Sequence, residues 1–437
     1  MADLQPFKGL RYSPAAHDDL GALLCPPYDV ISKQQQEELH GYSPYNAVRL
    51  ELGQDELNDS AEVNRYTRAA LLLEDWIREG VLVPETDSSF YLVEEQFYHI
   101  DRQVIRRSLL ARVRLEEFSK RIIIPHEETS SGPKQDRLEL LKATKANLSP
   151  IMGIYRDTSS NIQNLISEIV LGQPIIDTSY SGIRIKVWTI SDKEATQTVV
   201  TTLRGAPIYV ADGHHRYETA LGYRDLVNMA HTNQSANLSR DYIMMSLIEI
   251  EDPGLVVLPY HRVLTGLSQN NVDSIMKLVH ENFDVQSFGS ESTYSANIVV
   301  DLESKLDNAN KSSIAIGLVR NQEQGAYILT LKNDGESEAR TSSSLERCPT
   351  WILGKSILEP VLGTQQEAAA SGLLSFTHSS DEVDSLRTSD KLQIGFLLPP
   401  MPMPLFEEIV LSGERLPIKS TYFTPKLPTG LVINKFS

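Results

Sequence analysis

The chain has 437 residues, 41% hydrophobic and 23% charged, a composition typical of a globular protein with room for two domains. Its 58 acidic and 41 basic side chains give a formal net charge of −17, which argues against general binding to DNA or RNA. Two cysteines without metal spacing argue against a disulfide framework or a zinc ribbon, and no apolar run has the length of a membrane span. We therefore expect a soluble, cytoplasmic protein without nucleic-acid or membrane partners.

The N-terminal region contains a stiff loop, Cys25-Pro26-Pro27-Tyr28-Asp29-Val30, before a helix expected to begin near Ser32. Asp29 on this loop is a candidate ligand or general base; the alternative is an aspartate that bonds the backbone of its own turn. Residues 43–52 are predicted to form an alternating strand. An amphipathic helix at 61–81 follows, and the patterns then predict strands at 90–93, 100–104 and 108–115.

A polar cluster follows the apolar strand expected at 122–125, in a loop and in the helix expected at 135–146. Its members are His126, Glu127, Lys134, Asp136 and Arg137. His126 and Glu127 are candidates for acid and base or for ligands of a divalent cation, and the basic side chains are candidates for binding phosphate. The alternative is a solvated, charged loop without a function.

The middle of the chain alternates strands and helices, a rhythm typical of mixed α/β architecture. Strands are expected at 150–155 and 183–190, and helices at 160–171 and 191–204. The last of these helices leads into an apolar strand that is followed at once by a polar turn.

This turn begins where the buried strand expected at Ile208–Ala211 ends. Asp212 is a good N-cap, Gly213 allows close approach of a ligand, and helical periodicity continues from His214 to about residue 230. The first N–H groups of a helix lack partners and carry partial positive charge, so the turn is suited to an anion, usually phosphate.

Three further donors lie in the first turn of this helix, namely His214, His215 and Arg216. Arginine donates two parallel hydrogen bonds to an oxyanion, and histidine changes its charge near neutral pH. The alternative is an ordinary capped helix with exposed histidines. Adjacent helical residues point about 100° apart, which disfavours a metal site built from the two histidines.

Several motifs of the chain resemble those of a bacterial family known only as domain of unknown function 1015, over the whole length of the chain. The residues that carry this resemblance are Pro26–Val30, Pro125–Glu127, Asp136–Leu138, Asp212–Arg216, Lys419–Phe423 and Pro425–Lys426.

The turn Asp212–Arg216, together with Ala220, also resembles the signature turn of the ParB/sulfiredoxin superfamily. Members of that superfamily bind nucleotide phosphates at this turn and include partition proteins, sulfiredoxins and free-serine kinases. The resemblance implies a ParB/sulfiredoxin-like N-terminal portion. His214 stands where sulfiredoxins have their catalytic cysteine, which argues against sulfinic acid reduction.

The C-terminal part is expected to be a second α/β domain, with a boundary that divides the chain into residues 1–250 and 251–437. Strands are expected at 242–248, 314–319, 326–331 and 392–398, and helices at 272–282, 352–362 and 405–412. His261 and Arg262 form a further cationic pair, which either faces a cleft between the domains or caps the segment that follows.

The last distinctive segment places Lys419 and Lys426 on either side of several hydroxyl groups, including those of Ser420 and Thr421. Such a combination is suited to an anionic, oxygen-rich ligand, which we expect this lysine-rich segment to meet in the cleft. The alternative is an extended segment whose lysines lie along an apolar surface.

Two functions from different classes fit these patterns. The first is a small-molecule phosphotransferase that uses ATP or ADP with Mg²⁺; the resemblance to free-serine kinases implies serine phosphorylation or phosphoserine dephosphorylation. The second is a non-catalytic nucleotide-binding switch. In the phosphotransferase, the residues assigned to catalysis are Glu127, Asp136, His126 and Asp212, with Asp29 as a further carboxylate. The residues assigned to phosphate binding are Gly213, His214, His215, Arg216, Arg137, Lys419, Ser420, Thr421 and Lys426.

The structure is expected to bring three of these residues together. Arg216, Glu127 and Lys419 are expected to line one cavity.

Overall fold

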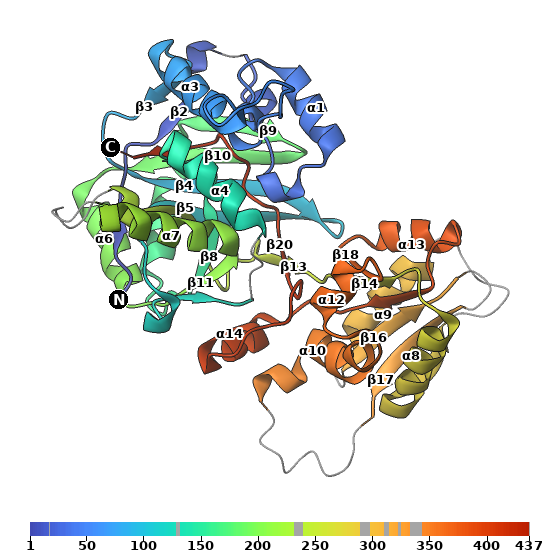
Figure 1. Ribbon diagram of the computed structural model, residues 1–437. Helices are drawn as coiled ribbons and strands as arrows, with labels where there is room; N and C mark the ends of the chain where they lie inside the picture. The colour runs from blue at the N-terminus through green and yellow to red at the C-terminus, as the bar shows by residue number, and fades with distance from the viewer. Residues whose placement is uncertain are drawn as a thin grey trace. The chain divides into compact units, whose positions relative to one another are not determined.

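The computed structural model describes residues 1–16, 18–127, 132–230, 239–288, 298–309, 314–321, 325–332 and 343–436. The chain forms two compact units (Figure 1). Unit 1 comprises Met1–Pro125, Thr129–Val256 and Pro425–Ser437, and unit 2 comprises His126–Glu128 and Val257–Thr424. The chain therefore passes between the units four times.

Unit 1 is built on a mixed sheet that has nine strands among the described residues. The strand order is β6 (Ile123–Pro125), β11 (Ile208–Asp212), β8 (Ile151–Tyr155), β12 (Tyr242–Glu249), β5 (Arg102–Arg114), β4 (Phe90–His99), β10 (Ile183–Ile190) and β9 (Ile176–Tyr180), and β1 (Leu4–Gln5) pairs with β5. The pairs β6/β11 and β8/β12 are parallel and the other pairs are antiparallel.

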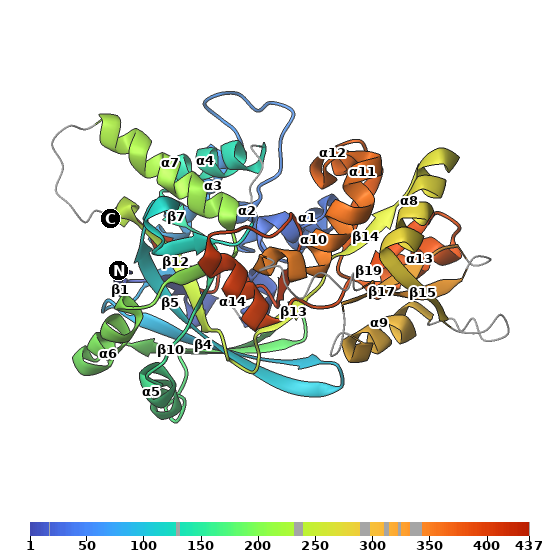
Figure 2. The ribbon, with the colours of Figure 1, turned by 90° about the horizontal axis from the view of Figure 1, so that it is seen from below.

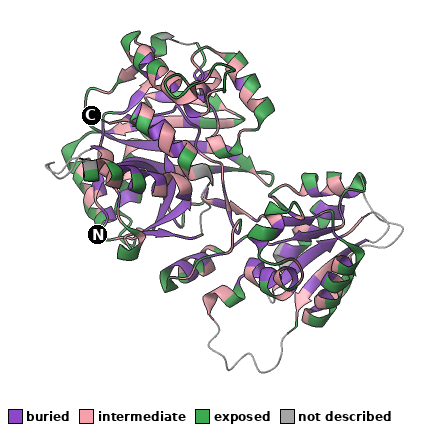
Figure 3. Cartoon of the chain, viewed as in Figure 1, coloured by how far each residue is buried: buried purple, intermediate pink, exposed green. Residues whose placement is uncertain are grey.

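Helices cover both faces of this sheet because its strands present apolar side chains alternately to each face. On β4, Tyr91 and Val93 belong to the core that includes Leu73 and Trp76 of α3 (Arg65–Arg78). Figure 2 shows α3, α4 (Gly132–Thr144) and α7 (His214–Ala230) on one side of the sheet, and α5 (Asn161–Ile169) and α6 (Lys193–Arg204) on the other. The strands are mostly buried, and the helices keep exposed outer faces (Figure 3).

The final residues of the chain belong to unit 1 rather than to unit 2. Ile433 pairs with Leu10, Thr429 pairs with Cys25, and β21 (Asn434–Lys435) pairs with β7 (Ala146–Asn147). The tail therefore connects separate segments of unit 1 by backbone hydrogen bonds.

Unit 2 contains an antiparallel sheet that has six strands among the described residues. Their order is β15 (Phe283–Phe288), β17 (Ala326–Leu331), β16 (Ala315–Val319), β19 (Ile394–Leu397), β14 (His261–Leu264) and β18 (Leu374–Thr377). The helices are α8 (Gln269–Asn282), α9 (Ile298–Ala309), α10 (Pro349–Leu353), α11 (Glu359–Leu362), α12 (Gln365–Ala370), α13 (Ser380–Thr388) and α14 (Met403–Ser412). Helix α8 contributes to the core on one face of the sheet and α9 to the core on the other.

The predicted mixed α/β class is confirmed, and so are the strand ending at the polar turn and the helix that follows it. The three strands predicted between 90 and 115 are instead one long hairpin, β4 and β5, whose turn holds Ile100 and Asp101 at positive φ. The ParB/sulfiredoxin-like character of the N-terminal portion stays a prediction. Within the described ranges, no helix is both long enough and apolar enough to cross a membrane.

The strand predicted at 43–52 is wrong. The segment turns at Asn46 and forms α2 (Val48–Glu51). The Asn46 side-chain oxygen accepts the Val48 N–H at 2.9 Å, and its amide nitrogen donates to the carbonyls of Ala22 and Leu24 at 2.8 and 3.0 Å. The buried asparagine therefore fixes a turn that the alternating pattern conceals.

Candidate functional site

The predicted site residues separate into two clusters, each within one unit. Unit 1 holds Asp29, Lys134, Asp136, Arg137, Asp212, Gly213, His214, His215, Arg216 and Lys426. Unit 2 holds His126, Glu127, Lys419, Ser420 and Thr421. The structure thus brings Glu127 and Lys419 together, and the cavity that they were expected to share with Arg216 stays a prediction.

The polar turn follows an interior strand of the sheet. Strand β11 has β6 on one side and β8 on the other, so its apolar side chains are buried. Gly213 then adopts φ +91°, and α7 begins at His214. A Cβ at Gly213 would lie 2.9 Å from Nη2 of Arg216, so this glycine is required both by the backbone conformation and by the guanidinium packed against it.

Replacing Gly213 with alanine is expected to destabilise the protein by about 1–3 kcal/mol, because the new side chain is strained at positive φ and displaces Arg216. Gly222→Ala is the matched control, since a Cβ there meets no atom within 4 Å and alanine favours the helix. Urea unfolding of both variants measures the difference. Equal stability of the two variants would contradict the role assigned to Gly213.

Arg216 is held in one position by three acceptors. Its Nη1 donates to Ser149 Oγ at 2.9 Å and to the Pro150 carbonyl at 2.8 Å, and its Nη2 donates to Asp212 Oδ2 at 2.7 Å. Only 10% of the side chain is exposed, and its buried Nε has no hydrogen-bond partner. Because guanidinium has five N–H donors, this rigid group keeps unused donor capacity beside the start of α7.

Asp212 lies between Arg216 and a lysine from the C-terminal tail. Lys426 Nζ contacts Asp212 Oδ1 at 2.6 Å and Asp29 Oδ2 at 2.5 Å. Burial acts to raise the pKa of Asp212, but the charges of Lys426 and Arg216 outweigh it and lower that pKa to about 2. Burial acts to lower the pKa of Lys426, and the two carboxylates raise it above its ordinary value. All three groups are therefore charged at neutral pH.

Wild-type protein is expected to be more stable than Asp212→Asn at neutral pH, by an amount on the order of 2 kcal/mol. Because the folded-state pKa is depressed, this advantage is present above the unfolded pKa near 4 and is lost as the pH falls through the folded value. Urea unfolding between pH 2 and 7 measures it. Asp177→Asn is the control, since its pair with Arg184 is exposed and contributes little. A constant difference across this range would contradict the assignment.

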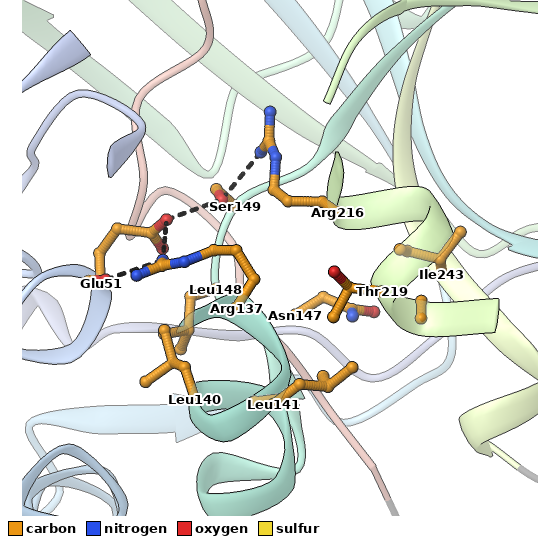
Figure 4. Close-up of a pocket in the computed structure, with 12 residues that line it drawn as sticks. Glu51, Arg137, Leu140, Leu141, Asn147, Leu148, Ser149, Arg216, Thr219 and Ile243 are labelled. Carbon is orange, nitrogen blue, oxygen red and sulfur yellow. Dashed lines mark hydrogen bonds and ion pairs between the residues drawn. The ribbon is translucent and has the colours of Figure 1, made fainter. Parts of the chain in front are cut away.

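Glu51 is a site residue that the sequence analysis missed. It lines a pocket with Arg137, Ser149 and Arg216 (Figure 4), and its Oε1 accepts from Arg137 Nη1 and Ser149 Oγ, both at 3.3 Å. Burial raises the pKa of Glu51, although Arg137 and Arg216 act to lower it. A chain of hydrogen bonds therefore joins the two arginines through a carboxylate and a hydroxyl.

The pocket has a polar wall and an apolar floor. Its free space is about 50 Å³, enough for a few water molecules and too small for a whole nucleotide. The floor consists of Leu140, Leu141, Ala146, Leu148, Ala220 and Ile243. With so little free space, the pocket packs around the two arginines and does not offer room for a large ligand.

Arg137 is oriented by neighbours on both sides. Asp136 accepts from Arg65 at 2.5 Å, Tyr66 at 2.8 Å and Arg137 Nε at 2.7 Å. Burial acts to raise the pKa of Asp136, but these donors lower it overall. The Arg137 guanidinium also lies 4.0 Å from the centre of the Tyr28 ring. Asp136 is therefore an ionised carboxylate whose hydrogen bonds fix an arginine.

The unit 2 cluster pairs the segment after β6 with the segment 416–421. His126 is buried, its Nε2 lies 2.9 Å from Thr421 Oγ1, and its ring packs against Phe406 and Phe423. Glu127 Oε2 accepts the Lys419 N–H at 3.3 Å. Ser420 is also buried, and its hydroxyl donates to the Pro417 carbonyl at 2.6 Å. His126, Ser420 and Thr421 therefore make their hydrogen bonds to other residues of unit 2, and these bonds hold the segment 416–421 in place.

The family comparison covers most of the chain. Residues 4–351 match the family model described as "Protein of unknown function (DUF1015)". The chain belongs to the DUF1015 family. The family's description assigns no activity, and no curated protein matches the chain.

Solved structures resemble this DUF1015 chain only distantly. A free serine kinase in complex with AMP is 12% identical over 78% of this chain and 95% of its own, with a TM-score of 0.38. A conserved hypothetical protein from Pyrococcus furiosus is 12% identical, covering 70% and 90%, with a TM-score of 0.36. SbnI with a C-terminal truncation, from Staphylococcus aureus, is 11% identical, covering 72% and 82%, with a TM-score of 0.36.

The pair His261–Arg262 of this DUF1015 chain lies on β14 and is fully buried within unit 2. The sequence left two alternatives, that this pair faces a cleft between the domains or that it caps the segment that follows. Neither of them predicts a fully buried pair. His214 is buried and His215 is half-buried. Across the described ranges, no group of three or more His, Cys, Asp or Glu side chains is placed to hold a metal ion.

Proposed function

We propose that this protein is a nucleotide-dependent small-molecule phosphotransferase whose nucleotide phosphates bind at the turn formed by Gly213 and the start of α7. The observation that carries the proposal is the rigid Arg216 at the N-terminus of a 17-residue helix, with its buried Nε unused. Helix N-termini attract phosphate through free N–H groups and partial positive charge. A fixed guanidinium adds charge-assisted donors without further ordering.

Two lysines are the proposed sources of the positive charge that phosphoryl transfer needs. Lys426 is fixed beside Asp212, and Lys419 is exposed in unit 2. Phosphoryl transfer depends mainly on positioning and on neutralising the charge of the transferred group. ATP or ADP with Mg²⁺ is the proposed nucleotide form, with the cation brought by the nucleotide. The resemblance of the turn to free-serine kinases makes serine the first acceptor to test, and phosphoserine the substrate of the reverse direction.

Glu127 is the proposed general base. The other carboxylates are less suitable, because cations at hydrogen-bond distance lower the pKa of Asp136 and of Asp212. A carboxylate that is strongly stabilised in its ionised form is a weak base. Asp29 is also paired, through Lys426. One contact of Glu127 is with the Lys419 backbone N–H, which its Oε2 accepts at 3.3 Å, so the proposed base lies beside a lysine that is a proposed phosphate ligand.

Isothermal titration of the full chain with ATP, ADP, AMP and GTP, each with Mg²⁺, tests the binding step. The nucleotide that binds is then supplied with serine. For the reverse direction, the same nucleoside with one phosphate fewer is supplied with phosphoserine, and product is followed by phosphorus NMR in both cases. Binding together with turnover supports the proposal. Binding without turnover of these substrates supports the nucleotide-binding switch instead, and failure of every nucleotide to bind would overturn both.

A further inference from the structure

Arg262 is a buried cation that needs an explanation. Its side chain is fully buried on β14 in unit 2, and within the described ranges no carboxylate is paired with it. Burial lowers the pKa of this guanidinium to about 9. Burying a charge without an ionic partner is costly, and the hydrogen bonds that the guanidinium makes must offset that cost.

The hydrogen bonds of Arg262 go to neutral acceptors. Nη1 donates to the carbonyls of Tyr260 and Lys419 at 2.8 and 2.9 Å, and Nη2 donates to the Ile418 carbonyl at 3.1 Å. Nε donates to Gln365 at 2.9 Å. Two of the four acceptors are thus consecutive carbonyls of one segment, and the buried guanidinium fixes the backbone there.

The segment that Arg262 fixes contains a strained lysine. Lys419 has φ +54°, a left-handed conformation that disfavours any residue with a Cβ. Its N–H is held by Glu127, and the neighbouring Ser420 hydroxyl closes the turn onto Pro417. Contacts on both sides of the peptide therefore impose a conformation that the chain would otherwise avoid.

The side chain of this lysine is exposed and carries an ammonium that lies 5.0 Å from the centre of the Tyr260 ring. Among the side chains that the structure describes, no carboxylate pairs with it, in a chain that has 58 acidic residues. An aromatic face holds a cation in place without neutralising its charge. The ammonium is thus directed and remains able to attract an anion.

We propose that Arg262 is a positioning residue for Lys419, and that the Lys419 ammonium binds a phosphoryl group. The assignment to phosphoryl transfer rests on the proposed function; the presentation of the lysine by Arg262 and Tyr260 does not. The phosphoryl group comes either from the nucleotide or from the phosphorylated small molecule, and the shared chemistry is a multiply charged oxyanion.

The variant Lys419→Gly of the full chain separates strain from function. Glycine adopts the left-handed conformation without strain. The melting temperature of Lys419→Gly is therefore expected to equal or exceed that of wild type and to exceed that of Lys419→Ala. Affinity for a phosphorylated ligand is expected to fall about tenfold or more, and Lys419→Arg is expected to retain most of it. Calorimetry with ATP and with phosphoserine shows which source supplies the group. Unchanged affinity for both, at wild-type level, would overturn the proposal.

A second experiment tests Arg262 independently of nucleotide binding. Full-length wild type and Arg262→Lys are labelled with an amine-reactive ester, with and without inorganic pyrophosphate, and labelling is measured by mass spectrometry. Pyrophosphate is expected to slow labelling of Lys419 severalfold in wild type and to have a smaller effect in Arg262→Lys, because a single ammonium does not reproduce the planar fork of donors that reaches both carbonyls and Gln365. Lys277 on α8, exposed beside Glu281, is the internal reference whose labelling should not respond.

Circular dichroism checks that Arg262→Lys is folded; if it is not, Gln365→Ala, which removes the acceptor of Arg262 Nε and keeps Lys419, serves as the second variant. A lack of pyrophosphate protection at Lys419 in wild type would overturn the inference even if a nucleotide binds elsewhere. Protection without binding of any nucleotide would overturn the proposed function and support the inference. Equal protection in wild type and a folded Arg262→Lys would overturn the positioning role of Arg262.

Discussion

Replacing Glu127 with glutamine is expected to lower kcat by about 10² to 10⁴ and to leave nucleotide affinity nearly unchanged. If Glu127 removes the proton of the acceptor hydroxyl, the amide keeps the size of the side chain and loses the base. Its oxygen still accepts the Lys419 N–H, so the strained segment in unit 2 is expected to persist. Steady-state kinetics and calorimetry on the same preparation measure the two quantities.

Glu127→Ala is the informative comparison, because alanine removes both the base and the acceptor for the Lys419 N–H. It is expected to lower stability as well as turnover. If wild type turns over its substrate and Glu127→Gln matches it, Glu127 is not the base, and Asp29 becomes the next carboxylate to test. If wild type binds nucleotide but shows no turnover, the substitution cannot lower kcat, and the result supports the nucleotide-binding switch.

The local part of the site could be predicted from the sequence because its signals are local. An apolar strand, an aspartate, a glycine and a helical repeat lie within a few residues of one another, and β11, Gly213 and α7 occur where these patterns place them. The same applies to Ser32, whose side chain caps α1 (Lys33–Tyr42). Short-range rules act on segments of this length and need no knowledge of the rest of the chain.

The supporting part of the site could not be predicted because its contacts join distant segments. Glu51 and Arg137 are 86 positions apart, and Lys426 and Asp29 are 397 positions apart. Glu51 also lies in a stretch whose alternating pattern predicts a strand. The contacts of Asn46 with Ala22 and Leu24, which are distant in the sequence, form a turn there instead. No pattern within one segment specifies such partners.

The polar turn region of unit 1 has four basic side chains and four carboxylates in its ion pairs, which limits how it can bind an anion. Its ion pairs involve Arg65, Arg137, Arg216 and Lys426 on one side and Asp29, Glu51, Asp136 and Asp212 on the other. With these charges balanced, the attraction for phosphate must come from directed donors and from the helix N-terminus rather than from excess charge. The cluster is therefore suited to one small phosphate group, in keeping with a surface that repels polyanions.

Replacing Arg216 with alanine is expected to weaken nucleotide binding by about 2 kcal/mol or more, roughly thirtyfold. Arg216 is the best-placed donor because Ser149, Pro150 and Asp212 hold its guanidinium beside the helix terminus. The substitution also leaves buried acceptors without their donor, so a loss of stability is expected in addition. Calorimetry below the melting temperature of the variant separates the two effects.

Arg224→Ala, in the same helix, is the matched control for this last prediction. Arg224 also donates to a backbone carbonyl, that of Leu115, and pairs with Glu117, but it lies eight residues further along α7 than Arg216. It is expected to cost stability and to leave nucleotide affinity unchanged, because the attraction of a helix terminus for phosphate extends over one turn only. Arg216→Lys is expected to fall between wild type and alanine, since an ammonium keeps the charge and cannot reach all three acceptors. If Arg216→Ala binds nucleotide as well as Arg224→Ala does, the phosphate site is not at this turn.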